Sequence, residues 1–193
     1  MAINENTMDR VFYAYLDDDS DGIRFISLVD QPAIEENYLL FNKQIKFSKD
    51  DNTHCLTGPI LIPNQKIYRR DDKGEYYIVF EADTIEKIAS RMITQGTAAK
   101  VDTQHNNQLE EGIYPIEIYL KDSKRNTLVG FEDLPDKTLF VTYKVENEEL
   151  YQKIKDDFKG FSIEALFTLK EIPTETEELQ EILSQLKKLR NIK

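Results

Sequence analysis

Hydrophobic and polar positions along most of this chain follow the short alternating runs that are typical of β-strands. Residues 11–16 and 22–29 are rich in aromatic and aliphatic side chains, and the acidic stretch between them has the composition of a turn. Together they predict a β-hairpin. Further strands are predicted at residues 56–62, 76–80, 113–120, 138–145 and 161–169. The predicted fold class is therefore α+β and mostly β.

Two segments instead show the three-to-four-residue spacing of apolar side chains that is typical of an amphipathic helix. The first begins at Asp83, a good N-cap, and ends at Gly96, a good helix stop. The second begins at Asn147 and ends at Gly160. Neither a strict strand–helix alternation nor a glycine-rich phosphate loop is present, which argues against a Rossmann or P-loop domain.

The end of the chain differs from the rest. Residues 1–173 are predicted to form one β-rich domain, and residues 174–193 a separate amphipathic helix with a narrow stripe of leucine and isoleucine on a highly charged surface. Such a stripe suits docking to a partner helix or to the domain's own surface.

Composition narrows the classes of function. The formal net charge of −11 repels phosphate backbones, so no nucleic-acid partner is expected. The apolar runs are too short to cross a bilayer, so no membrane partner is expected. The single cysteine, Cys55, excludes an internal disulfide and fits a reducing compartment. We expect a soluble, acidic, intracellular protein.

The candidate chemistry lies in residues 160–164, which read Gly-Phe-Ser-Ile-Glu. Ser162 and Glu164 are two apart on a predicted strand, so their side chains share one face, with α-carbons about 6.5–7 Å apart. A histidine between them contacts the serine with one ring nitrogen and the carboxylate with the other, as in catalytic triads. His105, in a polar stretch, is the candidate base. The same residues also fit a solvated strand face and an ordinary surface histidine.

Two other patterns are weaker. His54 and Cys55 are adjacent, and neighbours on a strand point to opposite faces, so they are not expected to pair with each other. A pairing of Cys55 with His105 stays open. The acidic stretch 17–22 matches the first half of a calcium-binding loop, but the twelfth position is Leu28, so an acidic turn is expected. No metal and no other cofactor is expected.

Several short stretches of the sequence are informative because of their combination and their order along the chain. They are 57–64 (Thr-Gly-Pro-Ile-Leu-Ile-Pro-Asn), 67–69 (Ile-Tyr-Arg), 77–80 (Tyr-Ile-Val-Phe) leading into the first helix, His105, and 159–164 (Lys-Gly-Phe-Ser-Ile-Glu). Their combination resembles the tailed-phage prohead proteases of the XkdF-like group. The likeness runs from about Phe25 to Leu169 and keeps the order and rough spacing of the elements.

The resemblance implies a fold related to herpesvirus assemblin, a β-barrel-like serine protease fold, here with flanking helices. It implies a serine endopeptidase in the host cytoplasm, inside the assembling procapsid. There it would cut the scaffold protein or the scaffolding segment of the major capsid protein, and itself, during capsid maturation. Those two proteins are the implied partners, a homo-oligomer is a further one, and the tail would dock onto scaffold or a second copy. The alternative is a catalytically inactive homologue that serves as a scaffold or minor capsid component.

Carried over by position, the resemblance makes Ser162 the nucleophile and His105 the general base. The third triad member is a second histidine in assemblin and an acid in other prohead proteases. Residues 25–33 resemble the stretch that carries this acid, as if the chain were permuted, but Phe25 stands in its place. The strand-face argument therefore makes Glu164 the predicted third member. The alternatives are Asp102 and Asp122.

Overall fold

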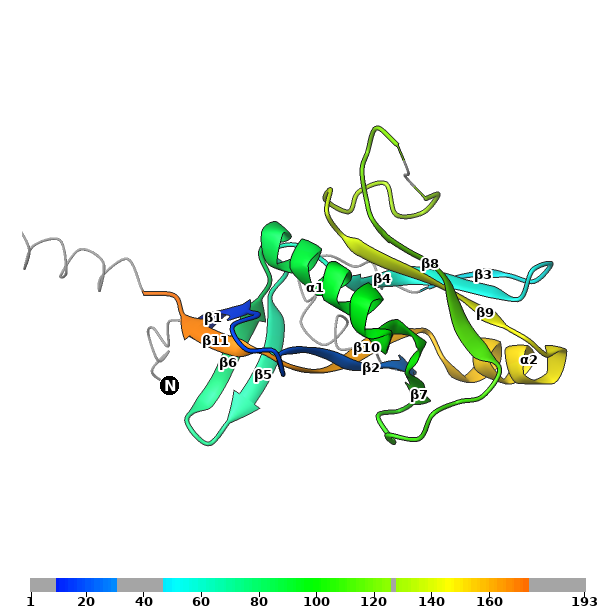
Figure 1. Ribbon diagram of the computed structural model, residues 1–193, viewed down its shortest axis with the longest axis horizontal. Coiled ribbons are helices and arrows are strands. Elements are labelled where there is room, and N and C mark those ends of the chain that lie inside the picture. The colour runs from blue at the N-terminus through cyan, green and yellow to red at the C-terminus, as the bar shows by residue number, and fades with distance from the viewer. Residues whose placement is uncertain (1–9, 31–46, 126–127, 174–193) are drawn as a thin grey trace, which may run out of the picture.

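The computed structural model describes residues 10–30, 47–125 and 128–173, and these form three β-sheets and two α-helices (Figure 1). The first sheet has the order β11-β1-β6-β5. Its strands are β1 (Arg10–Tyr15), β5 (Ile67–Asp71), β6 (Gly74–Val79) and β11 (Thr168–Glu171). The second sheet has the order β10-β2-β7, with β2 (Gly22–Val29), β7 (Val101–Thr103) and β10 (Gly160–Leu166).

The third sheet has the order β3-β4-β9-β8. Its strands are β3 (Ser48–Asp50), β4 (Cys55–Leu61), β8 (Ile113–Leu120) and β9 (Leu139–Val145). Strand β8 is an edge strand with a bulge at Pro115, as a proline within a strand predicts. The described strands confirm a mostly β, α+β class, but they form no closed barrel.

Helix α1 (Ala82–Gln95) is followed by a short 3-10 turn, η1 (Thr97–Ala99). The N-cap of α1 is Glu81 rather than the predicted Asp83, which lies in the first turn. Gly96, with φ 67°, ends the helix as predicted. Helix α2 (Glu148–Asp157) is capped by Asn147, whose side chain accepts a hydrogen bond from the N–H of Leu150. It ends at Asp157, before the predicted Gly160. None of the described helices is both long enough and apolar enough to cross a membrane.

The predicted hairpin of residues 11–29 is wrong, because β1 and β2 belong to different sheets. The acidic turn between them is folded around Asp21, whose carboxylate accepts hydrogen bonds from the N–H groups of Asp17 and Asp18. Arg91 of α1 donates to the backbone carbonyls of Asp18 and Asp21. These contacts anchor the turn to the helix, and the chain passes from the first sheet to the second instead of folding back on itself.

The single strand predicted at residues 161–169 is two strands in the structure. Strand β10 pairs with β2 in the second sheet, and β11 pairs with β1 in the first sheet. A register shift between Glu164 and Ala165 bulges β10, and bulges bend a strand and increase its twist. Phe167, between the two strands, packs edge-on against Phe80. The first two strands, β1 and β2, and the last two, β10 and β11, therefore lie in the same two sheets.

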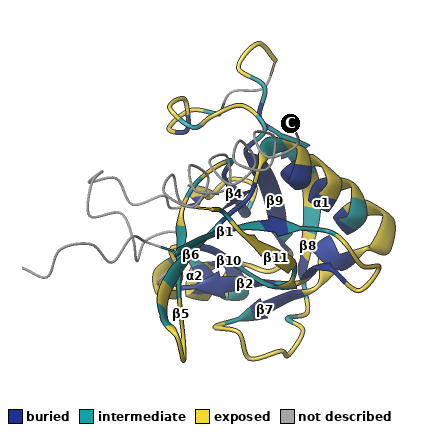
Figure 2. Ribbon diagram, turned by 90° about the vertical axis from the view of Figure 1, so that its left-hand side faces the viewer, coloured by how far each residue is buried: buried dark blue, intermediate teal, exposed yellow. Residues whose placement is uncertain are grey.

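The described residues share a hydrophobic core beneath the second and third sheets and α1, and the buried segments of the ribbon are dark blue in Figure 2. Ile26 and Leu28 of β2 are fully buried in it, and Phe161 of β10 packs against Tyr143 of β9. Burial raises the pKa of Tyr143, whose hydroxyl donates to the carbonyl of Ala98 at 2.6 Å. Since side chains alternate along a strand, the intervening residues of β2 and β10 occupy the other face of the sheet.

Candidate active site

Three polar residues lie side by side across the second sheet. Ser162 of β10 is directly opposite Ser27 of β2, and Ser27 is the register partner of Asp102 of β7. We call these three residues the polar row. Directly paired residues have α-carbons about 4.5–5.5 Å apart and their side chains on the same face. Ser27 and Asp102 are 0% exposed and Ser162 is 9% exposed, so the row is enclosed on the face away from the core.

His105 lies in a tight turn that follows β7. Gln104 and His105 both have positive φ values, of 52° and 57°, which is uncommon outside glycine. The N–H of Gln104 donates to the carbonyl of Leu28 at 2.9 Å, and the N–H of Asn107 donates to Asp102 Oδ2 at 2.8 Å. The turn is thus anchored at both ends, to β2 and β7, and is held beside the polar row.

The imidazole of His105 reaches the middle residue of the row. Its Nδ1 lies 2.9 Å from Ser27 Oγ, within hydrogen-bonding distance, and the tautomer of the ring decides which atom donates. Ser162 and His105 share no hydrogen bond within the described residues, but Ser162 is the direct neighbour of Ser27. The fold therefore brings the predicted nucleophile and base to adjoining positions on one sheet face. Their catalytic roles stay a prediction.

Glu164 lies two residues beyond Ser162 on the same strand face and is half-buried. It is directly opposite Phe25, the residue that stands where the resembling proteases carry an acid. The carboxylate of Glu164 therefore lies on β10 at the level of the sheet that Phe25 occupies on β2. The predicted contact of Glu164 with His105 stays a prediction.

The two alternative carboxylates are in different surroundings. Asp102 is fully buried in the polar row, and its Oδ1 has no hydrogen-bond partner there, although an unpaired buried acceptor costs free energy. Asp122 lies in the connection between β8 and β9, where its Oδ1 accepts a hydrogen bond from the N–H of Lys124 at 3.0 Å. Of the two, only Asp102 belongs to the row that His105 contacts.

Comparison with known protein families places most of the chain in one family. A family model described as "Putative phage serine protease XkdF" matches residues 44–171, about two thirds of the chain. The chain belongs to this family of phage serine proteases. No match was found among curated proteins, and none among solved structures.

The part of the chain that matches the XkdF family contains His105, Ser162, Glu164 and Asp102. Ser27 lies outside it, although it is the residue that His105 contacts. Sequence reasoning missed Ser27 as a site residue. The available signal was a small polar residue between Ile26 and Leu28 in an otherwise apolar stretch of β2.

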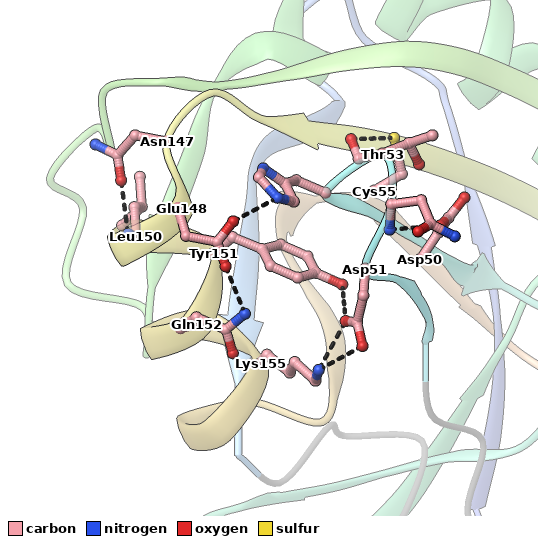
Figure 3. Close-up of polar contacts among 12 residues, drawn as sticks. Asp50, Asp51, Thr53, Cys55, Asn147, Glu148, Leu150, Tyr151, Gln152 and Lys155 are labelled. Atoms are coloured by element: carbon pink, nitrogen blue, oxygen red, sulfur yellow. Dashed lines mark hydrogen bonds and ion pairs between the residues drawn. The ribbon is translucent and has the colours of Figure 1, made fainter.

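The other histidine of the chain, His54, packs against α2. His54 Nε2 pairs with Glu148 at 2.7 Å, and its ring stacks on Tyr151 with centroids 4.9 Å apart. The hydroxyl of Tyr151 donates to Asp51, which also contacts Lys155 at 2.7 Å (Figure 3). Hydrogen bonds from Lys155 and Tyr151 lower the pKa of Asp51, whereas burial and the bond to Asp51 raise the pKa of Tyr151. These contacts tie the β3–β4 turn to α2.

Cys55 does not pair with His54. Its thiol is free and buried, and its hydrogen bond goes to the carbonyl of Thr53 at 3.4 Å (Figure 3). Within the described residues, no group of three or more His, Cys, Asp or Glu side chains is placed to hold a metal ion. The predicted tail helix, residues 174–193, lies outside the described part of the chain.

Proposed function

We propose that this phage protease is a serine endopeptidase in which Ser162 is the nucleophile and His105 the general base. The observation that carries this proposal is the polar row: Ser162 is the direct cross-strand neighbour of Ser27, whose hydroxyl lies 2.9 Å from His105 Nδ1. The second ring nitrogen of His105 is then available for Ser162. A general base needs a heavy-atom distance of about 2.6–3.2 Å, and such distances are often longer without substrate. His105 is exposed, which leaves its ring accessible to substrate.

The reaction follows from these two groups. His105 takes the Oγ proton while Ser162 attacks the peptide carbonyl, and the protonated imidazole passes that proton to the leaving amine as the C–N bond breaks. Water then attacks the acyl ester left on Ser162, and its proton goes to His105. The ester C–O bond breaks as His105 returns that proton to Ser162 Oγ, which releases the acid product and restores the serine. Backbone N–H groups stabilise the oxyanion in such reactions.

Glu164 is our candidate for the carboxylate that stabilises the protonated imidazole. It shares a strand face with Ser162, and a negative charge close to an imidazole favours the imidazolium. A half-buried position keeps this interaction less screened than it would be on an open surface.

For the biological role, we propose cleavage of the scaffold protein, or of the scaffolding segment of the major capsid protein, and of the protease itself, inside the procapsid. The support is membership of a phage serine protease family together with the resemblance to prohead proteases. A kinship with assemblin and self-association of the protease belong to the same proposal.

Co-expression with the phage capsid and scaffold proteins tests this function. The wild-type chain should cut them, whereas Ser162→Ala should leave both full length. Ser90→Ala is the matched control, because Ser90 is an exposed serine on α1, and this variant should process normally. Normal processing by Ser162→Ala would refute the proposal.

A non-catalytic capsid component is the second candidate. It is favoured by one observation: among the described residues, the hydrogen bond of His105 goes to Ser27 and not to Ser162. A fluorophosphonate probe, which labels activated serines, separates the two. Labelling of Ser162 supports the protease, and a procapsid that assembles normally around an unlabelled wild-type chain supports the structural role.

A further inference from the structure

We infer that Ser27 is a positioning residue, which holds His105 through Nδ1 and is itself backed by Asp102. This inference rests on the proposed function, because it explains how His105 is oriented toward Ser162. In serine–histidine sites, the group at Nδ1 fixes the tautomer and orientation of the ring, so that Nε2 faces the nucleophile. Here the group at Nδ1 is the hydroxyl of Ser27, at 2.9 Å.

Ser27 is poorly placed to be the nucleophile itself. Its side chain is 0% exposed, and β2 is the central strand of its sheet, flanked by β10 and β7. A peptide carbonyl cannot approach such a position without opening the sheet. Ser162, by contrast, lies on β10, which is an edge strand within the described residues. Ser27 is therefore assigned to orientation and Ser162 to attack.

Asp102 completes the arrangement. A serine hydroxyl donates one hydrogen, so when His105 donates its Nδ1–H to Ser27 Oγ, the hydroxyl hydrogen of Ser27 needs an acceptor. Asp102 is the register partner of Ser27, and its buried Oδ1 lacks a hydrogen-bond partner within the described residues. The two atoms share no hydrogen bond in the described structure, so one of the two side chains has to shift toward the other to satisfy both groups. The resulting order is Asp102, Ser27, His105, Ser162.

The other carboxylate oxygen of Asp102 supports the same histidine through the backbone. Asp102 Oδ2 accepts the N–H of Asn107 and so closes the turn that carries His105. One buried carboxylate thus fixes both the position of the histidine turn and, through Ser27, the tautomer of its ring. With the proton on Nδ1, the lone pair on Nε2 is the one available to act as a base.

The test measures two properties of the full chain: the rate at which a fluorophosphonate labels Ser162, and the tautomer of His105 from the nitrogen shifts of its ring. Ser27→Ala should slow labelling about 10- to 100-fold, the range expected when a residue that orients a catalytic group is lost. It should also move His105 away from the Nδ1–H tautomer. Ser27→Thr, which keeps the hydroxyl, should restore both properties to near wild type.

Val29→Ala is the matched control, because Val29 is a buried residue on the same face of β2. It should lower the melting temperature while leaving the labelling rate and tautomer unchanged. Equal losses in Ser27→Ala, Ser27→Thr and Val29→Ala would show a merely structural role and overturn the inference. So would an unchanged tautomer in Ser27→Ala.

The two proposals fail separately. If the wild-type chain is not labelled at all, the proposed function fails, and the tautomer measurement still decides the role of Ser27. A shift of tautomer in Ser27→Ala then supports the positioning contact, and no shift overturns it.

Discussion

Glu164 of β10 and Phe25 of β2 are direct cross-strand partners. Phe25 stands where the stretch that residues 25–33 resemble in prohead proteases carries an acid. The pairing places the Glu164 carboxylate at the same level of the sheet, on the adjacent strand. A bulge directly follows Glu164, and bulges bend a strand and increase its twist. Directly paired residues lie on the same face of a sheet, so a carboxylate at either position carries its charge on that face.

Glu164→Gln should slow fluorophosphonate labelling of Ser162 about 10- to 100-fold, which corresponds to the loss of roughly 1.4–2.7 kcal/mol of stabilisation of the protonated imidazole. The amide keeps the shape of the side chain but removes its charge. The measurement is the labelling rate near neutral pH. Glu149→Gln, an exposed change in the first turn of α2, is the control and should label at the wild-type rate. A wild-type rate for Glu164→Gln would remove Glu164 from the site.

The two histidines provide a matched pair of variants. His105→Ala should lower the labelling rate by about 10²- to 10⁴-fold, the usual contribution of a general base. His54→Ala should label at the wild-type rate but unfold at a lower temperature, because it loses the pair with Glu148 and the stacking on Tyr151. Labelling rates and thermal unfolding of both variants make the comparison. A loss of labelling in His54→Ala that matches that of His105→Ala would contradict the assignment.

The buried carboxylate of Asp21 should stabilise the fold in a pH-dependent way. Burial by itself raises the pKa of Asp21, but hydrogen bonds from Asp17, Asp18 and Thr168 together outweigh it and hold the pKa below its ordinary value. Asp21→Asn should therefore lower the free energy of unfolding by about 1–2 kcal/mol at neutral pH. Denaturant unfolding measures this difference.

The sign of the pH dependence follows from the lowered pKa. A carboxylate with a lower pKa in the folded state stabilises that state above its unfolded pKa, and the stabilisation is lost as the pH falls through the folded-state pKa. The difference between wild type and Asp21→Asn should thus be complete above about pH 4 and shrink below it. Asp19→Asn, an exposed change in the same turn, should show no such dependence. A difference that grows toward acid pH would refute the role of Asp21.

Local signals in the sequence predicted the elements well. The spacing of apolar residues and the stop at Gly96 located α1, and the N-cap at Asn147 located α2. Alternation located most strands and put Ser162 and Glu164 on one strand face, as the structure has them. These features are encoded within a few residues, because helix caps and side-chain alternation depend only on near neighbours along the chain.

Only the tertiary structure decided which strands meet. Alternation tells which face a residue occupies but not which strand lies beside it, so the hairpin at 11–29 and the single strand at 161–169 were wrong predictions. For the same reason no local pattern could show that Ser27 lies between Ser162 and Asp102, or that the turn after β7 brings His105 to it. The amino-acid sequence by itself determined which chemical groups are present and which strand face each occupies. Long-range strand pairing in the tertiary structure determined which groups are neighbours.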